Sequence, residues 1–366
     1  MLINPYLNLS KIQPYTPGEK PIGGNSKGIK LSANESALGA SPQALIAYSN
    51  AAENIERYPD ANAITIRNAI GDRYDLPIKK LLMGIGSDEI LSVLVRCFSG
   101  KGDEVLFPTC TFPLYKIYTL AAGASVVQAP DKNYCADVDS LLAHVTPRTK
   151  IVIIANPNNP TGTYLSKDEL NRLRKGLAED ILLIIDAAYS EYVAEDDYTD
   201  GVSLVNDAPN TVMTRTFSKV HGLAGLRLGW CYADPDIISI VGKIRSPFNV
   251  SIAAQEAAIG AIQDLEHEKR VVEHTRKWHD ILFKRFISLG LQITGTQGNF
   301  LCIGFKENAV VGSDSAHKFL RDNNIFVRHM RAFGLPNHLR ITIGLEEEIN
   351  RCSDMISQFI TDSRTR

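Results

Sequence analysis

The chain has 366 residues, of which 44% are hydrophobic and 22% are charged. These fractions are typical of a globular protein and exclude a disordered or fibrous one. The formal net charge is −2 at pH 7, so the chain has no basic surplus to neutralise a nucleic-acid backbone, and we expect no nucleic-acid partner. No apolar run approaches the ~20 residues that a membrane helix needs, and we expect no membrane partner.

The cysteines and the N-terminus predict the compartment. Six cysteines are scattered along the chain without a C-x-x-C pair, a pattern typical of free thiols in a reducing environment. A secretory signal has a basic leader followed by an apolar block. The sequence begins Met1-Leu2-Ile3-Asn4-Pro5 and does not show this pattern. We predict a cytoplasmic protein. The eight histidines show no H-E-x-x-H spacing, and we predict no metal site.

In chain order, the first segment runs to about Gly28 and is rich in Pro, Gly, Asn and Lys, which predicts an extended arm. The middle of the chain then alternates short apolar runs with amphipathic ones. The predicted strands are Glu104–Phe107, Ser125–Gln128, Lys150–Ala155, Ile181–Asp186, Thr211–Thr216 and Gly229–Ala233. The predicted helices are Asp88–Phe98, Phe112–Ala121 and Ser166–Glu179. This alternation predicts an α/β fold with a mostly parallel sheet.

The pattern changes after about Ser251. A long helical stretch, Gln255–Phe286, leads to the strand candidates Phe300–Phe305, Ile325–Arg328 and Leu339–Ile343, and then to a helix near Glu346–Ile360. Helices segregated from a few strands predict a smaller α+β domain. We therefore expect an N-terminal arm (1–28), a large α/β domain (45–251) and a small α+β domain (29–44 with 252–366).

A lysine follows one of the predicted strands. The segment Thr216-Phe217-Ser218-Lys219 ends the strand, and Arg227 comes eight residues after the lysine. A lysine at a strand end can point into a cleft, and the planar donor fork of an arginine suits phosphate. By itself the pattern also fits solvated charges in a glycine-rich loop.

An aspartate ends another predicted strand. Asp186 follows the apolar run Ile181–Ile185, where a carboxylate is costly unless a cation meets it. A protonated pyridine nitrogen is such a cation, and pairing with it makes the ring an electron sink. Tyr189, three residues later, is placed to reach the hydroxyl of the same ring. The alternative is an aspartate that caps a helix.

Two turns complete the set. The turn Asn156–Gly162 contains two prolines and a glycine and is rigid; either Asn159 donates to a ring oxygen or the segment is a plain turn. The segment Gly84–Glu89 opens a helix, whose first N–H groups can bind phosphate. Glu89 stands where a dinucleotide fingerprint needs its third glycine, which argues against a nicotinamide enzyme.

Together and in this order, the four segments resemble the signature of fold-type I pyridoxal-phosphate aminotransferases. The spacings of 27 residues from Asn159 to Asp186 and 33 from Asp186 to Lys219 match as well. Further segments resemble the histidinol-phosphate aminotransferase family over essentially the whole chain: Ala33–Gly39, Arg57–Asp60, Gly86–Glu89, Ser218–Lys219, Leu223–Arg227 and Leu339–Gly344. Ser36 and Ala37 depart from the Asn and Pro of that family.

The resemblance implies a fold-type I transferase in which Lys219 holds pyridoxal 5'-phosphate as a Schiff base. It implies the catalytic residues Lys219, Asp186 and Tyr189. The implied cofactor-binding residues are Ser87, Asp88, Phe112, Asn159, Asp186, Tyr189, Thr216, Ser218, Lys219, Arg227 and, lent by the second subunit of a homodimer, Tyr58. Phe112 is assigned as the ring that stacks on the cofactor although two extra residues follow Pro108-Thr109. The implied substrate-binding residues are Tyr15, Asn34, Arg328 and Arg340, with less support for Arg331.

The resemblance also implies a reaction. Histidinol phosphate would pass its amino group to 2-oxoglutarate, giving imidazole acetol phosphate and glutamate in histidine biosynthesis. The alternatives are an aromatic-amino-acid transaminase, a decarboxylase of a phosphorylated amino acid and a non-catalytic cofactor-binding protein. Release of carbon dioxide would distinguish the decarboxylase.

Overall fold

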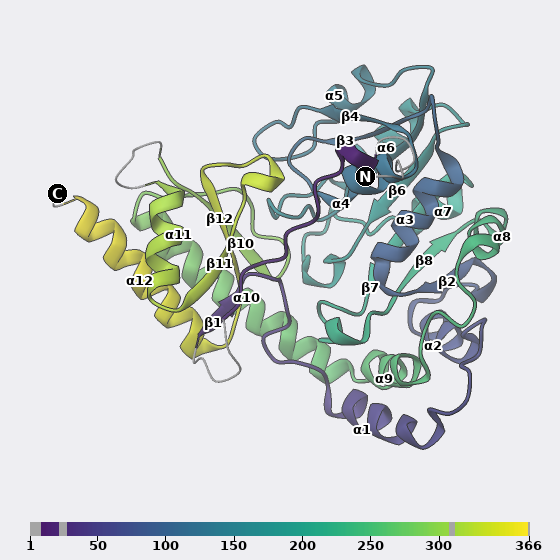
Figure 1. The fold of residues 1–366 in the computed structure, drawn as a ribbon, viewed down its shortest axis with the longest axis horizontal. Helices are drawn as coiled ribbons and strands as arrows, with labels where there is room; N and C mark the ends of the chain where they lie inside the picture. Colours follow the sequence, from purple (N-terminus) through teal and green to yellow (C-terminus); the bar gives the residue numbers. More distant parts are fainter. Residues whose placement is uncertain (1–8, 22–27, 307–311, 365–366) are drawn as a thin grey trace, which may run out of the picture.

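Most strands belong to one seven-stranded sheet of order β2-β8-β7-β6-β5-β3-β4 (Figure 1). The structure is a computed structural model that describes residues 9–21, 28–306 and 312–364; parts of the predicted arm lie outside these ranges. The strands are β2 (Leu81–Gly84), β3 (Glu104–Pro108), β4 (Ser125–Ala129), β5 (Thr149–Ala155), β6 (Leu182–Asp186), β7 (Thr211–Thr216) and β8 (Gly229–Ala233). The sheet confirms the predicted α/β class and includes every strand predicted before residue 251. The short strand β2 was not predicted.

The direction of the strands explains where the polar segments meet. The neighbours β4, β3, β5, β6 and β7 are parallel, whereas β8 runs antiparallel to both β7 and β2. The register pairs Ala155 with Asp186, and Asp186 with Thr214. The carboxyl ends of β5, β6 and β7 therefore lie at one edge, where open α/β sheets bind their ligands.

Helices cover both faces of this sheet because alternate strand residues point to opposite sides. Ile184 packs in one core cluster, with α3, α4 and α8, while Ile185 packs in another, with α5 and α6. A third cluster joins α1, α2 and α9 to β2, β7 and β8. These helices are α1 (Pro42–Asn50), α2 (Ile64–Tyr74), α3 (Gly86–Phe98), α4 (Leu114–Ala121), α5 (Val138–Ala143), α6 (Lys167–Gly176), α7 (Val202–Asp207), α8 (Pro235–Ile244) and α9 (Ile252–Gln263).

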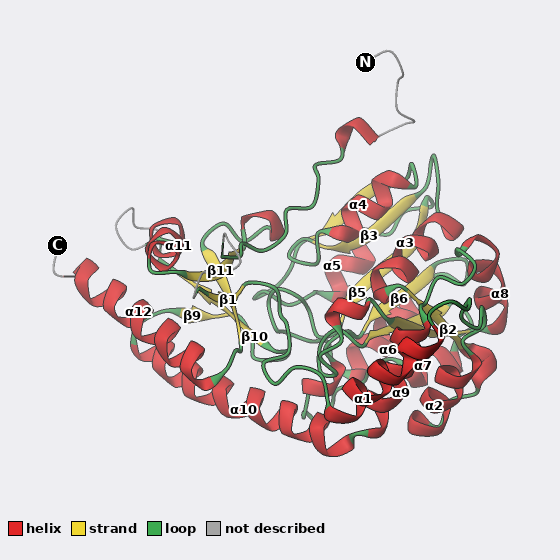
Figure 2. Cartoon of the chain, turned by 60° about the horizontal axis from the view of Figure 1, so that its bottom comes forward, coloured by secondary structure: helices red, strands yellow, loops and turns green. Residues whose placement is uncertain are grey.

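A second sheet has five strands in the order β1-β11-β12-β10-β9. Its strands are β1 (Ile29–Leu31), β9 (Gln292–Ile293), β10 (Phe300–Gly304), β11 (Ile325–His329) and β12 (His338–Thr342), and its helices are α10 (Leu265–Ser288), α11 (Ser313–Asp322) and α12 (Glu346–Arg364). These helices pack with the sheet in one apolar core. The long helix α10 extends from the helices beneath the large sheet to the small sheet (Figure 2).

The predicted helical stretch Gln255–Phe286 is wrong as a single helix. It is divided at Asp264, which has φ −89° and ψ 71° and whose side chain accepts from the N–H of His267 at the start of α10. A carboxylate that caps a new helix satisfies N–H groups that a continuous helix would have bonded. As a result α9 packs with the large sheet, while α10 packs with the small one. We keep the division of the chain into two domains as a proposal, and place α9 on the large-sheet side of the boundary.

A buried ion pair fixes the strand that leads to Lys219. Arg215 on β7 contacts Glu191 at 2.6 Å, and both side chains are less than 10% exposed. The guanidinium also lies 4.4 Å from the ring centre of Tyr74. Arg215 also lies 3.6 Å from Asp200, so removing Glu191 leaves the buried guanidinium with only this longer carboxylate contact, and breaking a buried pair is costly.

We therefore expect Glu191→Gln to lower the free energy of unfolding by about 3–5 kcal/mol, measured by denaturant unfolding. Asp322→Asn, which removes the exposed Lys318–Asp322 pair, is the matched control and should change the free energy far less. Equal effects of the two variants would contradict a structural role for the Arg215 pair.

Candidate active site

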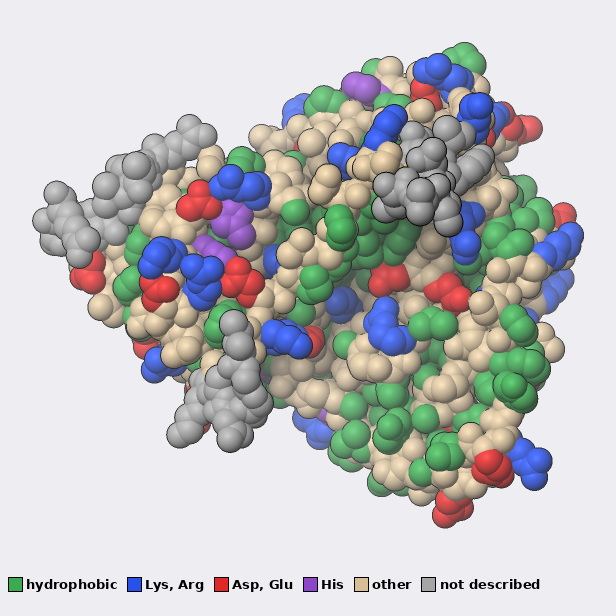
Figure 3. Space-filling view, in the orientation of Figure 1, with side chains coloured by type: hydrophobic (Ala, Val, Ile, Leu, Met, Phe, Trp, Pro, Cys, Tyr) green, Lys and Arg blue, Asp and Glu red, His purple; other side chains and the backbone are tan. Residues whose placement is uncertain are grey.

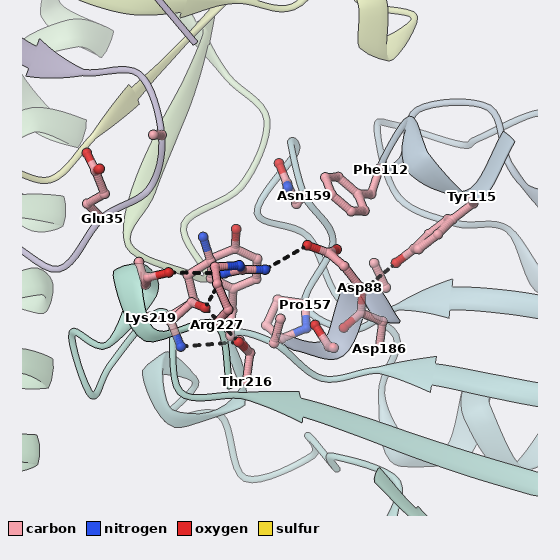
Figure 4. Close-up of a pocket in the computed structure, with 17 residues that line it drawn as sticks. Glu35, Asp88, Phe112, Tyr115, Pro157, Asn159, Asp186, Thr216, Lys219 and Arg227 are labelled. Atoms are coloured by element: carbon pink, nitrogen blue, oxygen red, sulfur yellow. Dashed lines mark hydrogen bonds and ion pairs between the residues drawn. The ribbon is translucent and has the colours of Figure 1, made fainter. Parts of the chain in front are cut away.

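A cavity of about 250 Å³ lies at the carboxyl ends of β5, β6 and β7. It brings together sequence-predicted residues from five separate segments of the chain, and Figure 4 shows how they lie around it. The predicted residues that line it are Ser87, Asp88, Phe112, Asn159, Asp186, Tyr189, Thr216, Ser218, Lys219 and Arg227. The remaining predicted residues, Tyr15, Asn34, Tyr58, Arg328 and Arg340, do not line it.

Asp186 lies at the floor of the cavity, at the end of β6. Its carboxylate accepts hydrogen bonds from the Tyr115 hydroxyl at 2.7 Å and from the Thr214 hydroxyl at 3.3 Å. Burial raises the pKa of Asp186 to about 6. Among the described residues no basic group lies within 4 Å of it, so the site holds an acid that lacks a cationic partner. A ligand cation placed here would favour the ionised carboxylate.

Lys219 follows β7 and reaches the cavity from the opposite wall to Phe112. Its Nζ lies 3.3 Å from the backbone oxygen of Asn34 and 5.5 Å from the ring centre of Tyr189. In the described part of the chain this amine forms no ion pair. The amine is therefore available to a ligand.

Several donors converge at the end of the cavity near α3. Helix α3 begins at Gly86 without a side-chain N-cap, so its first N–H groups remain free for an anion. Thr216 and Ser218 contribute hydroxyls 3.0 Å apart, and Arg227 donates to the Ser218 hydroxyl at 3.3 Å. This set of donors suits a phosphate.

Close packing around Arg227 depends on glycine. Gly86 has φ +73°, and a Cβ there would lie 2.6 Å from Nη2 of Arg227. Arg227 also contacts Asp88 at 3.2 Å, with both side chains about 40% exposed. Because an exposed pair of this kind contributes little, a dianion can take the place of Asp88 as a partner of Arg227.

Arg340 is buried beside Asn159. It donates to Oδ1 of Asn159, and its Nη2 donates to the backbone oxygen of Ser32 at 3.2 Å. Burial lowers the pKa of Arg340, and its Nε has no hydrogen-bond partner among the described residues. No carboxylate within the described ranges lies within 4 Å. A buried arginine without a counter-ion indicates an anion-binding position.

Asn34 holds other site residues in place. It has φ +55°, and its Nδ2 donates to the Tyr189 hydroxyl at 2.9 Å. Its Oδ1 accepts from Thr342 at 3.2 Å, and its backbone oxygen accepts from both Lys219 and Asn299. The polar atoms of Asn34 are thus already bonded, which favours a positioning role over direct contact with substrate.

The arm contributes to the mouth of the cavity. The ring of Tyr15 meets that of Phe112 edge-on, with centres 6.5 Å apart. Arg328 lies 5.5 Å from the centre of the Tyr15 ring and donates to the backbone oxygen of Thr16 at 2.5 Å. Arg331 instead pairs with Asp314 at 2.8 Å on the surface. The structure therefore brings Arg328 into contact with the arm, whereas Arg331 lines a separate surface cavity next to the arm and is engaged with Asp314.

Tyr58 lies outside the site of its own chain. It is 81% exposed and stacks on Phe248, with ring centres 4.8 Å apart. The sequence offered no sign of this contact with Phe248.

Two contacts of Asp186 were not predicted from the sequence. Tyr115 had no predicted role, and its position in the sequence does not indicate that its hydroxyl reaches Asp186. Thr214 could have been found, because it stands two residues before Thr216 on the same strand and therefore on the same face. Asn299 could not be predicted from a local pattern. Its Nδ2 donates to the backbone oxygen of Asn34, and the two residues are 265 positions apart in the sequence.

Comparison with known proteins identifies the class. The sequence profile of the aminotransferase class I and II family matches residues 26–356. The chain belongs to this family.

The names of individual relatives are more specific than the name of the family. The chain is 46% identical, over 92% of each chain, to a histidinol-phosphate aminotransferase of Rhodopseudomonas palustris (strain TIE-1). It is 44% identical to that of Paramagnetospirillum magneticum, over 97% of this chain and 98% of the relative. A crystal structure of histidinol-phosphate aminotransferase from Sinorhizobium meliloti in complex with pyridoxal-5'-phosphate aligns with a TM-score of 0.84 and 27% identity, covering 92% of this chain and 91% of that one.

More distant structures share only the architecture. Aspartate aminotransferase from Thermus thermophilus with maleate aligns with a TM-score of 0.80 at 20% identity, over 91% of both chains. These alignments confirm the predicted fold-type I class. Within the described residues, no group of His, Cys, Asp and Glu could hold a metal ion, and none of the described helices is long and apolar enough to cross a membrane.

Proposed function

We propose that this chain uses pyridoxal 5'-phosphate to transfer the amino group of histidinol phosphate to 2-oxoglutarate. The observation that carries the proposal is the single cavity that holds the Lys219 amine, the unpaired acid Asp186 and the phosphate-binding donors around Arg227. Relatives named histidinol-phosphate aminotransferase at 43–46% identity support this choice of substrate.

The residues present fit the cofactor at both ends. Thr216, Ser218, Arg227 and the start of α3 would hold its phosphate, and Asp186 would meet its ring nitrogen. Phe112 would cover one face of the ring. When bound, the cofactor supplies an electron sink that stabilises negative charge on the substrate α-carbon.

The remaining chemistry belongs to the chain. Lys219 would hold the cofactor covalently, and its Nζ, once released, would take the proton from the substrate α-carbon. Asp186 would keep a proton on the ring nitrogen, because a buried carboxylate favours a neighbouring positive charge. Tyr189, oriented by the amide of Asn34, would donate to the ring oxygen together with Nδ2 of Asn159.

One basic pocket can serve both half-reactions. Histidinol phosphate carries a distal phosphate and no α-carboxylate, whereas glutamate carries two carboxylates. An arginine fork binds either anion. We assign this role to Arg340 and Arg328, with Tyr15 closing over the substrate from the arm.

Arg340→Ala should raise the KM for both histidinol phosphate and glutamate. Loss of one charge-assisted contact costs about 1.5–3 kcal/mol, or roughly ten- to a hundredfold in affinity. Arg331→Ala is the matched control, because Arg331 already pairs with Asp314 on the surface. Steady-state kinetics that show unchanged KM values in Arg340→Ala, or equal changes in both variants, would refute the assignment.

The aromatic rings at the cavity mouth are also compatible with an aromatic-amino-acid transaminase. Tyr15 and Phe112 would pack against a phenyl ring as well as against an imidazole. Half-transamination rates with histidinol phosphate, phenylalanine and glutamate, measured side by side, separate the two functions. If kcat/KM for histidinol phosphate proves no higher than for phenylalanine, the substrate proposal fails while the aminotransferase assignment stands. Release of carbon dioxide would instead favour the decarboxylase.

We further propose a homodimer in which Tyr58 reaches the cofactor phosphate of the second subunit. Large apolar side chains are exposed near Tyr58, and Figure 3 shows hydrophobic side chains gathered over α1. Leu45, Ile46 and Tyr48 on α1 are exposed, as are Ile55 and Phe248, which stacks on Tyr58. Apolar patches of this kind mark interaction surfaces. Cytoplasmic location stays a prediction.

A mixed dimer tests this arrangement. One subunit carries Tyr58→Phe and the other carries Lys219→Ala. If Tyr58 acts in trans, the site that retains Lys219 receives a normal tyrosine and should turn over at the wild-type rate per site. A rate equal to that of the Tyr58→Phe homodimer would show that Tyr58 acts within its own chain, and an active monomer in light scattering would rule out the dimer.

A further inference from the structure

A buried side-chain amide joins two segments of the active-site wall. Cys110 and Thr111 are the two extra residues that follow Pro108-Thr109, and both bond to Asn158. Nδ2 of Asn158 donates to the backbone oxygen of Cys110 at 2.7 Å, and its Oδ1 accepts from the Thr111 hydroxyl at 2.9 Å. The proposed reaction uses none of these three residues.

The partners of this amide fix its orientation. A backbone carbonyl can only accept, so the NH₂ group of Asn158 faces Cys110 and the amide oxygen faces Thr111. Nδ2 also donates to the Thr161 hydroxyl at 2.8 Å. Thr111 and Asn158 are 4% and 5% exposed, so solvent does not compete for these bonds. Loss of the Thr111 donor would leave a buried amide oxygen without a partner, which is costly.

The next residue in each segment lines the active-site cavity. Phe112 follows Thr111, and Asn159 follows Asn158; Figure 4 shows both at the cavity. Oδ1 of Asn159 accepts a hydrogen bond from Arg340, so the turn has an anchor of its own in the small sheet. The bond between Thr111 and Asn158 ties the loop of Phe112 to this anchored turn.

The loop has a second anchor, which lies one residue earlier. The loop follows β3, which lies between β5 and β4 in the sheet. The N–H of Cys110 donates to the carboxylate of Asp131, after β4, at 2.8 Å, while Thr111 donates to Asn158, after β5. A variant that lacks the Thr111 hydroxyl therefore keeps the loop attached at Cys110 and loses the bond next to Phe112.

We infer that Thr111 and Asn158 are positioning residues that hold the Phe112 ring against the face of the cofactor. The inference rests on the proposed cofactor and on the place of Phe112 over its ring. Two extra residues lengthen the loop, and the Thr111 hydroxyl restrains it where it enters the cavity. Without that bond the ring of Phe112 moves, the cofactor is held less firmly, and its alignment with the substrate is lost. The anion contacts of Arg340 come from the small sheet and stay in place.

Release of cofactor from the diluted holoenzyme, followed by its absorbance, tests the restraint. Thr111→Val should release the cofactor about three- to tenfold faster than the wild type. Thr111→Ser keeps the hydroxyl and should restore the wild-type rate. Thr109→Val is the matched control, because the Thr109 hydroxyl belongs to the same loop and donates instead to the backbone oxygen of Ala129 at 3.1 Å. It should leave release unchanged.

A double-mutant cycle tests whether Thr111 acts through Phe112. Phe112→Ala by itself should speed cofactor release, since it removes the ring that covers the cofactor. Adding Thr111→Val to Phe112→Ala should speed release no further, because the group that the hydroxyl positions is already absent. A role limited to the stability of the loop would give additive effects.

Steady-state kinetics supply a second readout. Thr111→Val should lower kcat by about ten- to a hundredfold and leave the KM for glutamate unchanged. Asn158→Asp replaces the donor to Cys110 with an acceptor and should show the same pattern; if this variant fails to fold, the Thr111 variants still decide the matter.

Three results would overturn the inference. They are wild-type release and kcat in Thr111→Val, additive effects of Thr111→Val and Phe112→Ala, and a Thr111→Ser variant that behaves like Thr111→Val. Unchanged release in Phe112→Ala would show that Phe112 does not cover the cofactor, and the inference would fail with that placement. A wild-type chain that binds no pyridoxal phosphate would refute the proposed function itself, which distinguishes the two failures.

Discussion

Replacing Lys219 with alanine should lower turnover by at least about 10²–10⁴-fold, the contribution that a positioned acid or base makes by itself. The loss should be larger still, because the variant also lacks the amine that holds the cofactor. Within the described ranges, Lys219 is the one lysine that lines the cavity. Single-turnover measurement of amino-group transfer gives the readout, and Lys175→Ala on the exposed side of α6 is the control that should retain full activity.

Chemical rescue with small amines tests whether Lys219 acts through its free amine. If the missing function is a free amine, methylamine should restore part of the rate of Lys219→Ala and have no effect on the wild type. The variant should still bind the cofactor through the donors around Arg227. Turnover close to the wild-type rate without added amine would show that Lys219 is not the reacting lysine.

Asp186→Asn should lower turnover by about 10²–10³-fold, comparable with the loss of one preorganised electrostatic contact in an active site. Asparagine keeps the shape of the side chain but removes the charge that would hold a proton on the cofactor ring. The matched variant Tyr115→Phe removes the 2.7 Å hydrogen bond to Asp186 and keeps the charge, so it should be affected less.

Cofactor retention separates binding from chemistry in these variants. Asp186→Asn should keep its cofactor, because the phosphate-binding donors lie at the other end of the cavity. Near-normal turnover of Asp186→Asn, or a greater loss in Tyr115→Phe, would contradict the role assigned to the carboxylate.

The position of the site could be predicted because it follows from the parallel sheet. Continuous apolar runs such as Ile151–Ile154 and Ile181–Ile185 are typical of strands buried on both faces, and polar residues that end neighbouring parallel strands meet at one edge. The lysine, the aspartate and the asparagine turn therefore came together as expected. Their order along the chain, together with the resemblance, indicated the cofactor.

Contacts that depend on side-chain direction or on distant segments could not be predicted. The bond from Tyr115 to Asp186 depends on how α4 packs against β6, and the contacts of Asn34 join residues from the start of the chain to Tyr189 and Thr342. The break at Asp264 was missed because helical periodicity continues across it. Tyr58 is a further case, since its proposed partner belongs to another subunit.

Chemical labelling tests the central assignment most directly. The holoenzyme is reduced with borohydride, which fixes a cofactor held through a carbon–nitrogen double bond, and it is then digested and mapped by mass spectrometry. The cofactor mass should appear on the peptide that contains Thr216-Phe217-Ser218-Lys219, at Lys219. Label on any other lysine, or no label in an enzyme that is active before reduction, would contradict the account.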